Sequence, residues 1–323
     1  MRTLSAYSIG ENGALTPIPG SPFAAGNLPS SVTVDPTGKF AYVVNEGCNN
    51  VSAYRIGENG ALTPIPGSPF AAETDPHEVA VDPAGKFAYV VNAVSNSVSA
   101  YRIGENGALT PIPGSPFAAG SFPRSVAVDP TGKFVYAANQ VSNNVSAYRI
   151  GKDGALTPVP GSPFSAGIGP FSVAVDPTAK FAYVVNEGDG NVSAYQISEN
   201  GTLVPIPGSP FAAGSDPVEV AVDPTAKFAY VANQVSHNVS VYSIGGNGAL
   251  TPIPGSPFSA GIESVSVAAG PTGKFVYVVS KFSHNVSAYQ IDEEGTLRPV
   301  AGSPFPAGVG PNSVAFSPNP KNL

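Results

Sequence analysis

Short apolar segments, rich in β-branched and aromatic residues, recur along the chain between polar turns. Ser125–Pro130, Phe87–Asn92 and Val98–Ile103 represent three kinds of segment, each with the length and composition of a β-strand. A fourth kind, Leu109–Phe117, contains several prolines. It fits only at the edge of a sheet, because proline cannot donate a hydrogen bond to a strand ladder. Pro-Thr-Gly-Lys and Gly-Glu-Asn-Gly supply the predicted turns between the strands.

The four kinds of segment follow one another in a repeat of 47 residues. The string Pro-Gly-Ser-Pro-Phe ends at Phe23 and recurs at this interval up to Phe258, and Ala-Gly-Ser-Pro-Phe ends at Phe305. Four antiparallel strands per repeat, with the proline-rich strand outermost, are typical of a propeller blade. We therefore predict an all-β chain, a single domain over residues 1–323 folded as a seven-bladed β-propeller. A β-solenoid is the competing interpretation, but its coils are usually shorter.

The two ends of the chain each supply part of one blade. The N-terminal end begins with a third strand (Leu4–Ile9) and a fourth, and the C-terminal end holds a first strand (Ser313–Ser317). We expect these strands to combine in a composite closing blade. That blade lacks a second strand, because Phe-(Ala/Val)-Tyr-(Val/Ala) occurs only six times. We expect a monomer, with association through the open edge of this blade as the alternative.

Aromatic residues keep to fixed positions in the repeat. All 13 tyrosines and 13 of the 17 phenylalanines occupy second-strand, third-strand or fourth-strand positions. We interpret them as core residues packed between neighbouring blades, with a repeated ligand-stacking site as the alternative. The absence of tryptophan disfavours a repeat lectin, because sugar-stacking sites favour that residue.

The composition excludes several classes of protein. The 36 glycines and 35 prolines exclude a helical bundle, because both residues break helices. No apolar run approaches the roughly 18 residues of a membrane span, and the N-terminal residues do not resemble a signal peptide. A net charge of −7 argues against nucleic acid as a partner, and the single Cys48 excludes an internal disulfide. The low charge and the abundance of Ser, Asn and Gly suit an extracytoplasmic protein.

Charge and unusual residues gather at one face of the predicted propeller. The loops between second and third strands, and those between blades, lie on what we call the top face; the lysine-bearing turns lie on the bottom face and are interpreted as solvated. The top loops hold nine acidic and two basic residues, together with all three histidines. These residues are Glu46, Glu73, Asp75, Glu78, Glu187, Asp189, Asp216, Glu219 and Glu263; Arg124 and Lys281; and His77, His237 and His284.

This concentration predicts a binding site for a small molecule or a protein at the acidic top-face mouth of the channel. The alternative is that exposed loops vary freely. Asp75 and Glu78 are matched three repeats later by Asp216 and Glu219, so these four carboxylates are a candidate site for Ca²⁺ or another divalent cation. The sequence requires no cofactor. The predicted ligand-binding residues are Glu46, Asp75, Phe122, Phe171, Glu187, Asp216 and Glu219.

The repeat resembles that of the bacterial lactonase-type propellers, also described as YVTN repeats. The resemblance rests on Ser125–Tyr136 and on the Tyr-Val-Val-Asn-Glu strings Tyr42–Glu46 and Tyr183–Glu187, and it spans essentially the whole chain. It implies the seven-bladed fold. The enzymes of this family resemble 6-phosphogluconolactonase and a cycloisomerase acting on carboxymuconate, with His, Arg and Glu side chains on the top face.

The catalytic pattern of that family is incomplete in this chain. Arg124 matches the Pro-Arg-His motif, but Ser125 replaces its histidine and Gln140 replaces the glutamate of the later Asn-Glu pair. His77 and Glu78 lie one repeat earlier. The resemblance implies His77 or Glu78 as a catalytic base, Arg124 as the cation that stabilises an oxyanion, and Gln140 as an orienting group.

Two functions follow from these observations. The first is a rigid binding scaffold with an acidic mouth, because the low charge, the copied blades and the incomplete catalytic pattern favour binding without catalysis. The second is a lactone hydrolase with its site on the top face. The nine carboxylates repel a phosphorylated lactone and one arginine provides little for a phosphate, which leaves a neutral lactone as the substrate open to this hydrolase.

Overall fold

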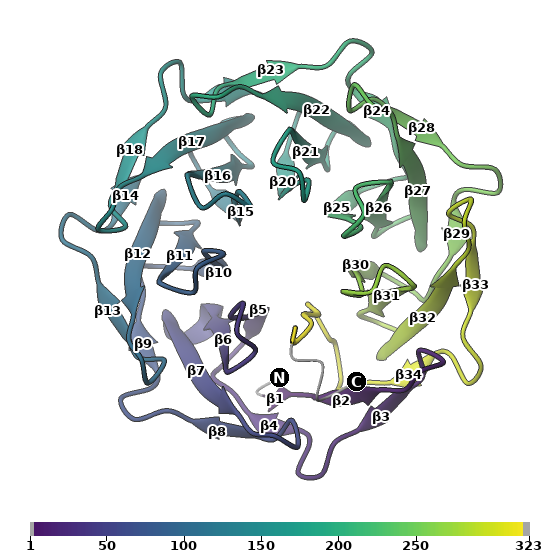
Figure 1. The fold of residues 1–323 in the computed structure, drawn as a ribbon, viewed down its shortest axis with the longest axis horizontal. Coiled ribbons are helices and arrows are strands. Elements are labelled where there is room, and N and C mark those ends of the chain that lie inside the picture. The colour runs from purple at the N-terminus through teal and green to yellow at the C-terminus, as the bar shows by residue number, and fades with distance from the viewer. Residues whose placement is uncertain (1–2, 319–323) are drawn as a thin grey trace.

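Six sheets of the same strand order surround a central channel in the computed structural model, which describes residues 3–318 (Figure 1). In the first blade the order is β5-β6-β7-β8, and β9 also pairs with β7. The first strand of each blade is innermost and the fourth outermost (Figure 1). The predicted all-β propeller is confirmed. Within residues 3–318, no helix is long and apolar enough to cross a membrane.

The strand bounds repeat from blade to blade. The first blade comprises β5 (Pro29–Val34), β6 (Phe40–Asn45), β7 (Asn50–Ile56), β8 (Leu62–Pro64) and β9 (Phe70–Ala71), with a 3₁₀ turn η1 (Glu46–Cys48). The second comprises β10 (Pro76–Val81), β11 (Phe87–Asn92), β12 (Ser97–Ile103), β13 (Leu109–Pro111) and β14 (Phe117–Ala118). The third comprises β15 (Pro123–Val128), β16 (Phe134–Asn139), β17 (Asn144–Ile150), β18 (Leu156–Pro158) and β19 (Phe164–Ser165). The fourth comprises β20 (Pro170–Val175), β21 (Phe181–Asn186), β22 (Asn191–Ile197), β23 (Leu203–Pro205) and β24 (Phe211–Ala212). The fifth comprises β25 (Pro217–Val222), β26 (Phe228–Asn233), β27 (Asn238–Ile244), β28 (Leu250–Pro252) and β29 (Phe258–Ser259). The sixth comprises β30 (Ser264–Ala269), β31 (Phe275–Ser280), β32 (Asn285–Ile291), β33 (Leu297–Pro299) and β34 (Phe305–Pro306).

The proline-rich segment, predicted as one outer strand, forms two short strands in each blade. In the second blade β13 and β14 pair with opposite ends of β12. The prolines between them cannot donate to the ladder, so other groups satisfy the backbone of β12. The amide of Ala100 donates to Ser115 Oγ (2.9 Å), and its carbonyl accepts from the amide of Ile112 (2.9 Å).

The hydrophobic core lies between neighbouring blades. Phe87, Tyr89 and Val91 of β11 pack against residues of the third blade, including Val135 and Tyr148. Most tyrosine hydroxyls bond across these interfaces, as Tyr89 donates to the carbonyl of Gly154 at 3.1 Å, whereas the buried hydroxyl of Tyr230 has no partner among residues 3–318. The interpretation of the repeated aromatics as core is confirmed.

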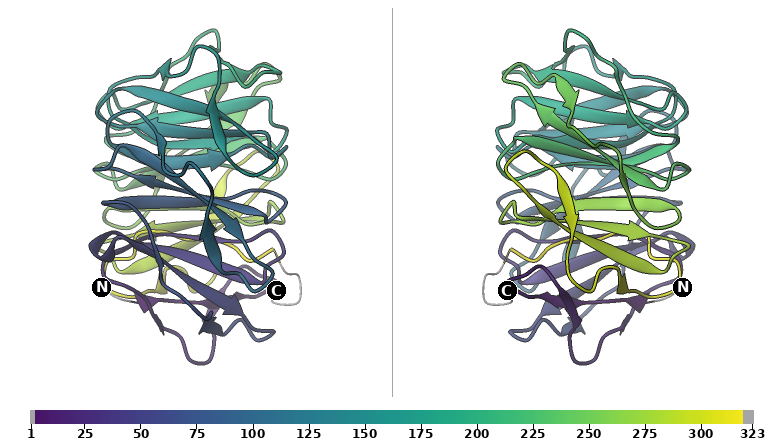
Figure 2. Two further views of the ribbon diagram at one scale, coloured as in Figure 1. Left: turned by 90° about the vertical axis from the view of Figure 1, so that its left-hand side faces the viewer. Right: turned by 90° about the vertical axis from the view of Figure 1, so that its right-hand side faces the viewer.

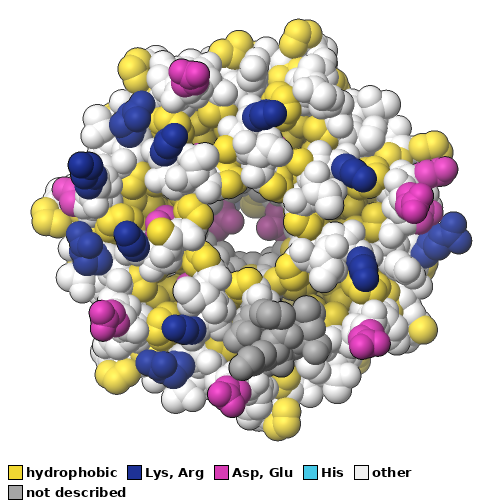
Figure 3. All heavy atoms as spheres, viewed as in Figure 1, with side chains coloured by type: hydrophobic (Ala, Val, Ile, Leu, Met, Phe, Trp, Pro, Cys, Tyr) yellow, Lys and Arg dark blue, Asp and Glu magenta, His cyan; other side chains and the backbone are white. Residues whose placement is uncertain are grey.

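A buried aspartate holds each of five bottom turns. Asp129 accepts hydrogen bonds from the amides of Thr131 (3.1 Å), Lys133 (2.7 Å) and Phe134 (2.6 Å), which closes the β15–β16 turn. The backbone amide of Lys133 is therefore part of the turn, whereas its side chain lies exposed at the surface. Figure 3 shows Lys and Arg side chains spread around the channel on one face, with acidic side chains inside the channel.

The seventh sector differs from the six blades. We define the closing sector as β1 (Thr3–Leu4), β2 (Tyr7–Ile9), β3 (Leu15–Pro17), β4 (Phe23–Ala24) and residues 311–318. Here β1 pairs with β4 and β2 with β3, as two separate two-stranded sheets. The described ends of the chain lie at opposite faces of the molecule (Figure 2).

The prediction of a first strand at Ser313–Ser317 is wrong, because the described residues there form no strand. The predicted third strand, Leu4–Ile9, is also interrupted between β1 and β2. Both departures have one cause: no second strand among the described residues offers these segments a ladder of hydrogen bonds. Instead, Ser313 Oγ accepts from the amide of Val32 at 3.4 Å, and Phe316 packs edge-on against Tyr277.

Candidate functional site at the channel mouth

A residue with left-handed backbone precedes the first strand of each blade at the top face. Asp75 (φ 59°) and Phe122 (φ 58°) hold this position, and Gly169 holds it in the fourth blade. The amide of Asp75 donates to Asn49 Oδ1 (3.0 Å), and the amide of Phe122 donates to Asn96 Oδ1 (2.8 Å). These bonds to the preceding blade offset part of the strain of a non-glycine residue with positive φ.

Arg124, at the start of β15, is the centre of the cluster. Its guanidinium carbon lies 4.8 Å from the ring centroid of Phe122 and 5.1 Å from that of Phe171. Its Nε donates to Gln140 Oε1 at 2.9 Å, and its Nη1 lies 2.9 Å from His77 Nε2. Aromatic faces and fixed acceptors therefore hold the guanidinium in one orientation.

His77, on β10, joins Arg124 to two carboxylates. Its Nδ1 lies 3.0 Å from Glu46 Oε1, and its Nε2 lies 3.3 Å from Asp75 Oδ2. Because a guanidinium only donates, a neutral His77 accepts from Arg124 through Nε2 and donates from Nδ1 to Glu46. The His77 side chain is 12% exposed, so the pair lies below the surface but within reach of a ligand.

The cluster carries more negative than positive charge. Burial lowers the pKa of Arg124, while the charges of Glu46, Glu187 and Asp75 raise it. The guanidinium stays cationic, because its ordinary pKa lies far above neutral pH. Glu187 also accepts a hydrogen bond from Gln140 Nε2 at 2.7 Å, so Gln140 links the arginine to a carboxylate of the next blade. Three carboxylates around one guanidinium make this a poor site for an anion.

Glu78 and Glu219 lie on innermost strands, apart from the arginine cluster. Glu78 Oε2 accepts from the amide of Val126 at 2.9 Å, and Glu219 Oε2 accepts from that of Val267 at 2.7 Å. Desolvation raises the pKa of Glu78 to about 6. Desolvation and, to a lesser degree, the charge of Glu78 raise the pKa of Glu219 to about 8. Glu78 is thus engaged by the next blade and is not bonded to His77 or Arg124 in the described structure.

The four carboxylates considered for a cation do not form one cluster. Within residues 3–318, no group of three or more His, Cys, Asp or Glu side chains is arranged to hold a metal ion. Asp75 contacts His77, whereas Asp216 lines a groove beside Glu187 and Asp189. A divalent cation at the mouth stays a prediction from the sequence alone.

Two of the three top-face histidines bond to backbone amides of top-face loops and lie outside the Arg124 cluster. His237 Nδ1 lies 3.0 Å from the amide of Glu263, and His284 Nδ1 lies 3.0 Å from that of Gly310. They occupy the repeat position of Asn49 and, like Asn49, accept from the amide that precedes the next first strand. Of the three histidines, only His77 therefore belongs to the cluster.

Asn139, next to Gln140, has a structural role. Its buried amide donates to Asn144 Oδ1 (2.8 Å) and Ser146 Oγ (2.9 Å).

The sequence reasoning missed that serine and glutamate share one position on the innermost strands. Ser125 Oγ accepts from the amide of Val173 at 3.0 Å, as Glu78 does from Val126 one blade earlier. The signal was present, because Glu78 and Ser125 are 47 residues apart. The same offset separates His77 from Arg124, and Gln140 from Glu187. In this fold, an offset of one repeat places side chains in contact across a blade boundary.

A family model described as "Lactonase, 7-bladed beta-propeller" matches residues 3–167 and 166–323. The chain belongs to this lactonase propeller family. None of the curated proteins compared with it matches.

Solved structures share the fold of this lactonase-family propeller across nearly its whole length. A putative 6-phosphogluconolactonase from Bacteroides fragilis is 22% identical, with a TM-score of 0.82, covering 97% of this chain and 95% of its own. The periplasmic gluconolactonase of Pseudomonas aeruginosa is 18% identical, with a TM-score of 0.79 and coverages of 95% and 96%. The hydrazine synthase of Kuenenia stuttgartiensis is 20% identical, with a TM-score of 0.71 and coverages of 90% and 90%. At these identities the similarity shows the fold alone, and proteins with different names share this fold.

Proposed function

We propose that this protein binds a small, uncharged, polar molecule of the sugar-lactone class at the top-face mouth. The observation that carries the proposal is the orientation of Arg124. Its Nε is bonded to Gln140 and its Nη1 to His77, while Nη2 has no partner among residues 3–318. A fixed donor beside two phenylalanine rings is suited to the carbonyl oxygen of a small ring compound.

The surrounding groups favour a neutral, hydroxyl-bearing ligand. The carboxylates of Glu46, Asp75 and Glu187 accept hydrogen bonds, which hydroxyl groups donate. The same three charges disfavour a phosphorylated ligand, because they lie close enough to raise the pKa of Arg124. The names of the family and of two structural neighbours, which refer to lactonases, support the lactone class.

The closing sector, in this proposal, is a seventh and incomplete blade that completes the ring. Its strands β1 to β4 lie at the repeat positions of β7 to β9 of the first blade. Tyr7 donates to the carbonyl of Pro306 at 2.8 Å, as Tyr54 donates to that of Ala24 at 2.6 Å. The sector therefore makes the same contact between blades as a complete blade does.

Binding is tested with an uncharged lactam analogue of gluconolactone, which cannot be hydrolysed. We expect Arg124→Gln to weaken its binding by about tenfold or more, measured by isothermal titration calorimetry, because a positioned charged donor is lost. Arg149→Gln is the matched control, since Arg149 packs over Phe134, outside the mouth cluster. Equal affinity of Arg124→Gln and the unaltered protein, or tighter binding of a 6-phosphorylated analogue, would contradict the proposal.

A second candidate function is hydrolysis of the bound lactone, favoured by the contact between His77 and Glu46. The bound lactone carbonyl would take over the Nη1–H that Arg124 donates to His77 Nε2. With its Nδ1–H held by Glu46 and its Nε2 released, His77 would take a proton from water as that water attacks the carbonyl carbon. Arg124 would stabilise the oxyanion, and the proton would return to the ring oxygen as the carbon–oxygen bond breaks.

Hydrolysis of gluconolactone, followed in a pH-stat, tests this candidate. We expect His77→Gln to lower kcat by about a hundredfold, the lower end for general-base loss, while changing lactam affinity much less. The neighbouring exposed Glu73→Gln is the control and should hydrolyse normally. No turnover by the unaltered protein above the uncatalysed rate rejects this candidate and leaves the binding proposal untouched.

A further inference from the structure

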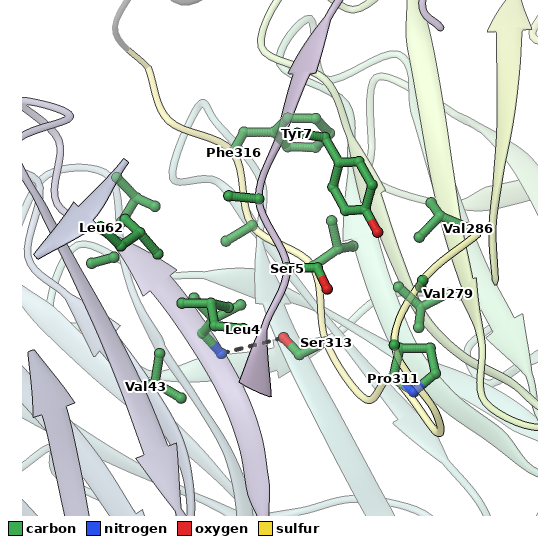
Figure 4. A pocket seen from close by; sticks show the side chains of 18 of the residues that line it. Leu4, Ser5, Tyr7, Val43, Leu62, Val279, Val286, Pro311, Ser313 and Phe316 are labelled. Atoms are coloured by element: carbon green, nitrogen blue, oxygen red, sulfur yellow. Dashed lines mark hydrogen bonds between the residues drawn. The ribbon is translucent and has the colours of Figure 1, made fainter. Parts of the chain in front are cut away.

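A cavity of about 720 Å³ lies between the closing sector and the first and sixth blades. Its lining is largely apolar. Figure 4 shows Leu4 of β1, Val43 of β6 and Leu62 of β8 around it, with Val279 of β31 and Phe316. An apolar cavity beside a strand edge is typical of a binding site.

The cavity lies where a second strand lies in each complete blade. There the second strand separates the first from the third, and β6, β11 and β16 are buried at every residue. Among residues 3–318, β1 and β2 of the closing sector pair only with outer strands, and residues 311–318 form no strand. The described core clusters each join neighbouring blades, but none joins β1–β3 to β5–β8. The cavity continues the interface that second strands fill elsewhere.

A glycine marks the place of a missing phenylalanine. In the turn between third and outer strands, Gly201 lies against the ring of Phe134, so that an added Cβ would lie 2.4 Å from it. Gly13 is covered in the same way by Phe275, at 2.5 Å. Gly60 has the same left-handed backbone, with φ 77°, but among the described residues an added Cβ would meet only Ile18, at 3.1 Å. The phenylalanine repeat position for Gly60 is Asn322, outside the described residues.

A carbonyl marks the place of a missing tyrosine. Tyr136 donates to the carbonyl of Gly201 at 3.1 Å, and Tyr277 donates to that of Gly13 at 2.9 Å. Five second-strand tyrosines make this bond, and Tyr230, whose hydroxyl has no partner among residues 3–318, is the exception. Gly60, which lines the cavity, has no tyrosine at the equivalent repeat position among residues 3–318. The cavity wall therefore carries the marks of two aromatic side chains in the order of a second strand.

We propose that this cavity binds an extended peptide of the second-strand type, Phe-Ala-Tyr-Val-Val-Asn. The peptide adds as a strand to the edge of β1 and β2 that pairs with no strand among residues 3–318, so the backbone gives affinity. Its phenylalanine covers Gly60 and its tyrosine donates to the Gly60 carbonyl. Because side chains alternate along a strand, only one phase of the peptide places both aromatic rings in the cavity.

Fluorescence anisotropy tests the proposal with the full chain and a labelled peptide, Lys-Phe-Ala-Tyr-Val-Val-Asn-Glu. We expect saturable binding at one site per chain. A peptide of the same composition with the two aromatic residues adjacent, Lys-Phe-Tyr-Ala-Val-Val-Asn-Glu, should bind about tenfold or more weakly, because no register places both rings on one face. Leu4→Arg should abolish binding by placing a charge in the cavity, whereas Val204→Arg, at an exposed outer strand, should leave it unchanged. Equal binding of both peptides overturns the proposal.

An extended chain provides a second, independent measurement. Eight residues, Phe-Ala-Tyr-Val-Val-Asn-Glu-Gly, placed before Met1 continue the 47-residue register into the closing sector. We expect this variant to unfold at a higher temperature and to bind no added peptide. An unchanged unfolding temperature with undiminished peptide binding overturns the proposal. So does a dimer, detected by sedimentation, that excess peptide does not dissociate, because a second copy would then be the occupant.

Discussion

Glu78 and Glu219 share one repeat position, three blades apart, and bond to their neighbours in the same way. The pKa of Glu219 nevertheless rises further, to about 8 against about 6, and the charge of Glu78 is one cause. A repeated backbone thus sets where a side chain lies, while the sum of all charges sets its protonation. Near neutral pH the two carboxyls differ in charge.

The raised pKa of Glu219 predicts a pH dependence of stability. Its pKa lies near 4.3 in an unfolded chain and near 8 in the fold, so the folded state binds more protons between these values. The free energy of unfolding should therefore fall as pH rises from about 5 to 8. We expect Glu219→Gln to gain at least about 1 kcal/mol on the unaltered protein between pH 5 and pH 9, measured by urea unfolding.

Two further variants separate this effect from a general change in charge. Glu73→Gln removes an exposed carboxylate from the same face and should show no such gain. Glu78→Gln should lower the pKa of Glu219 and shift the fall in stability to lower pH, because one repelling charge is gone. A stability that is the same at pH 5 and pH 9 in all these proteins would contradict the assignment.

At the level of single residues, the repeat made the cluster partly predictable. Glu46, His77 and Arg124 stand out in the sequence because they break an otherwise copied pattern. Their contacts could not be predicted, because they cross blade boundaries and depend on the loop backbone. The positive φ of Asp75 and Phe122 is such a feature, since neither residue type requires it.

At the level of elements, each turn before an outer strand is built around a glycine, and among the described residues every one of these glycines except Gly60 lies under a phenylalanine. This contact joins a turn to the second strand of the preceding blade, so it fixes how neighbouring blades pack. Gly201 and Gly60 have similar backbone angles, φ 89° and φ 77°, but only Gly201 lies against a phenylalanine ring. A comparison of alanine substitutions at Gly201 and Gly60 therefore separates the cost of backbone strain from the cost of crowding against the ring.

We predict that Gly201→Ala destabilises the protein more than Gly60→Ala does. Both variants place a side chain at positive φ, which costs about 1–2 kcal/mol. Only Gly201→Ala also forces the ring of Phe134 to move, which adds about 1–3 kcal/mol. Thermal and urea unfolding measure both. Equal losses would show that the ring contact contributes nothing.

The strands themselves were largely predictable, and the exceptions have physical causes. Phe87–Asn92 was predicted as a second strand and forms β11 with the same bounds. Leu109–Phe117 was predicted as one strand and forms two, because prolines interrupt its pairing. Ser313–Ser317 has a strand-like sequence but no partner among the described residues. A sequence pattern reports what a segment favours, whereas a strand also needs a neighbour.

At the level of the whole molecule, the closing sector is where the ring is weakest in contacts. Tyr54 is 3% exposed in the first blade, whereas Tyr7, its equivalent, is only partly buried. Since neighbouring blades bury their cores against each other, an incomplete interface at one place lowers the stability of the closed ring as a whole. The site takes its residues from the first to fourth blades, and Arg124 itself lies on the third blade, away from that weakness.

The left-handed residue before each first strand has a consequence for engineering. Where a side chain of the preceding loop holds its amide, as at Asp75 and Phe122, the blade does not depend on which side chain it carries. Randomising this position around the ring would vary the recognition surface while leaving its framework intact, as in the loops of an antibody domain. The chain thus offers a scaffold for selected binders, with variable positions at Asp75, Phe122 and Glu263, where the amide is held and the residue is not glycine.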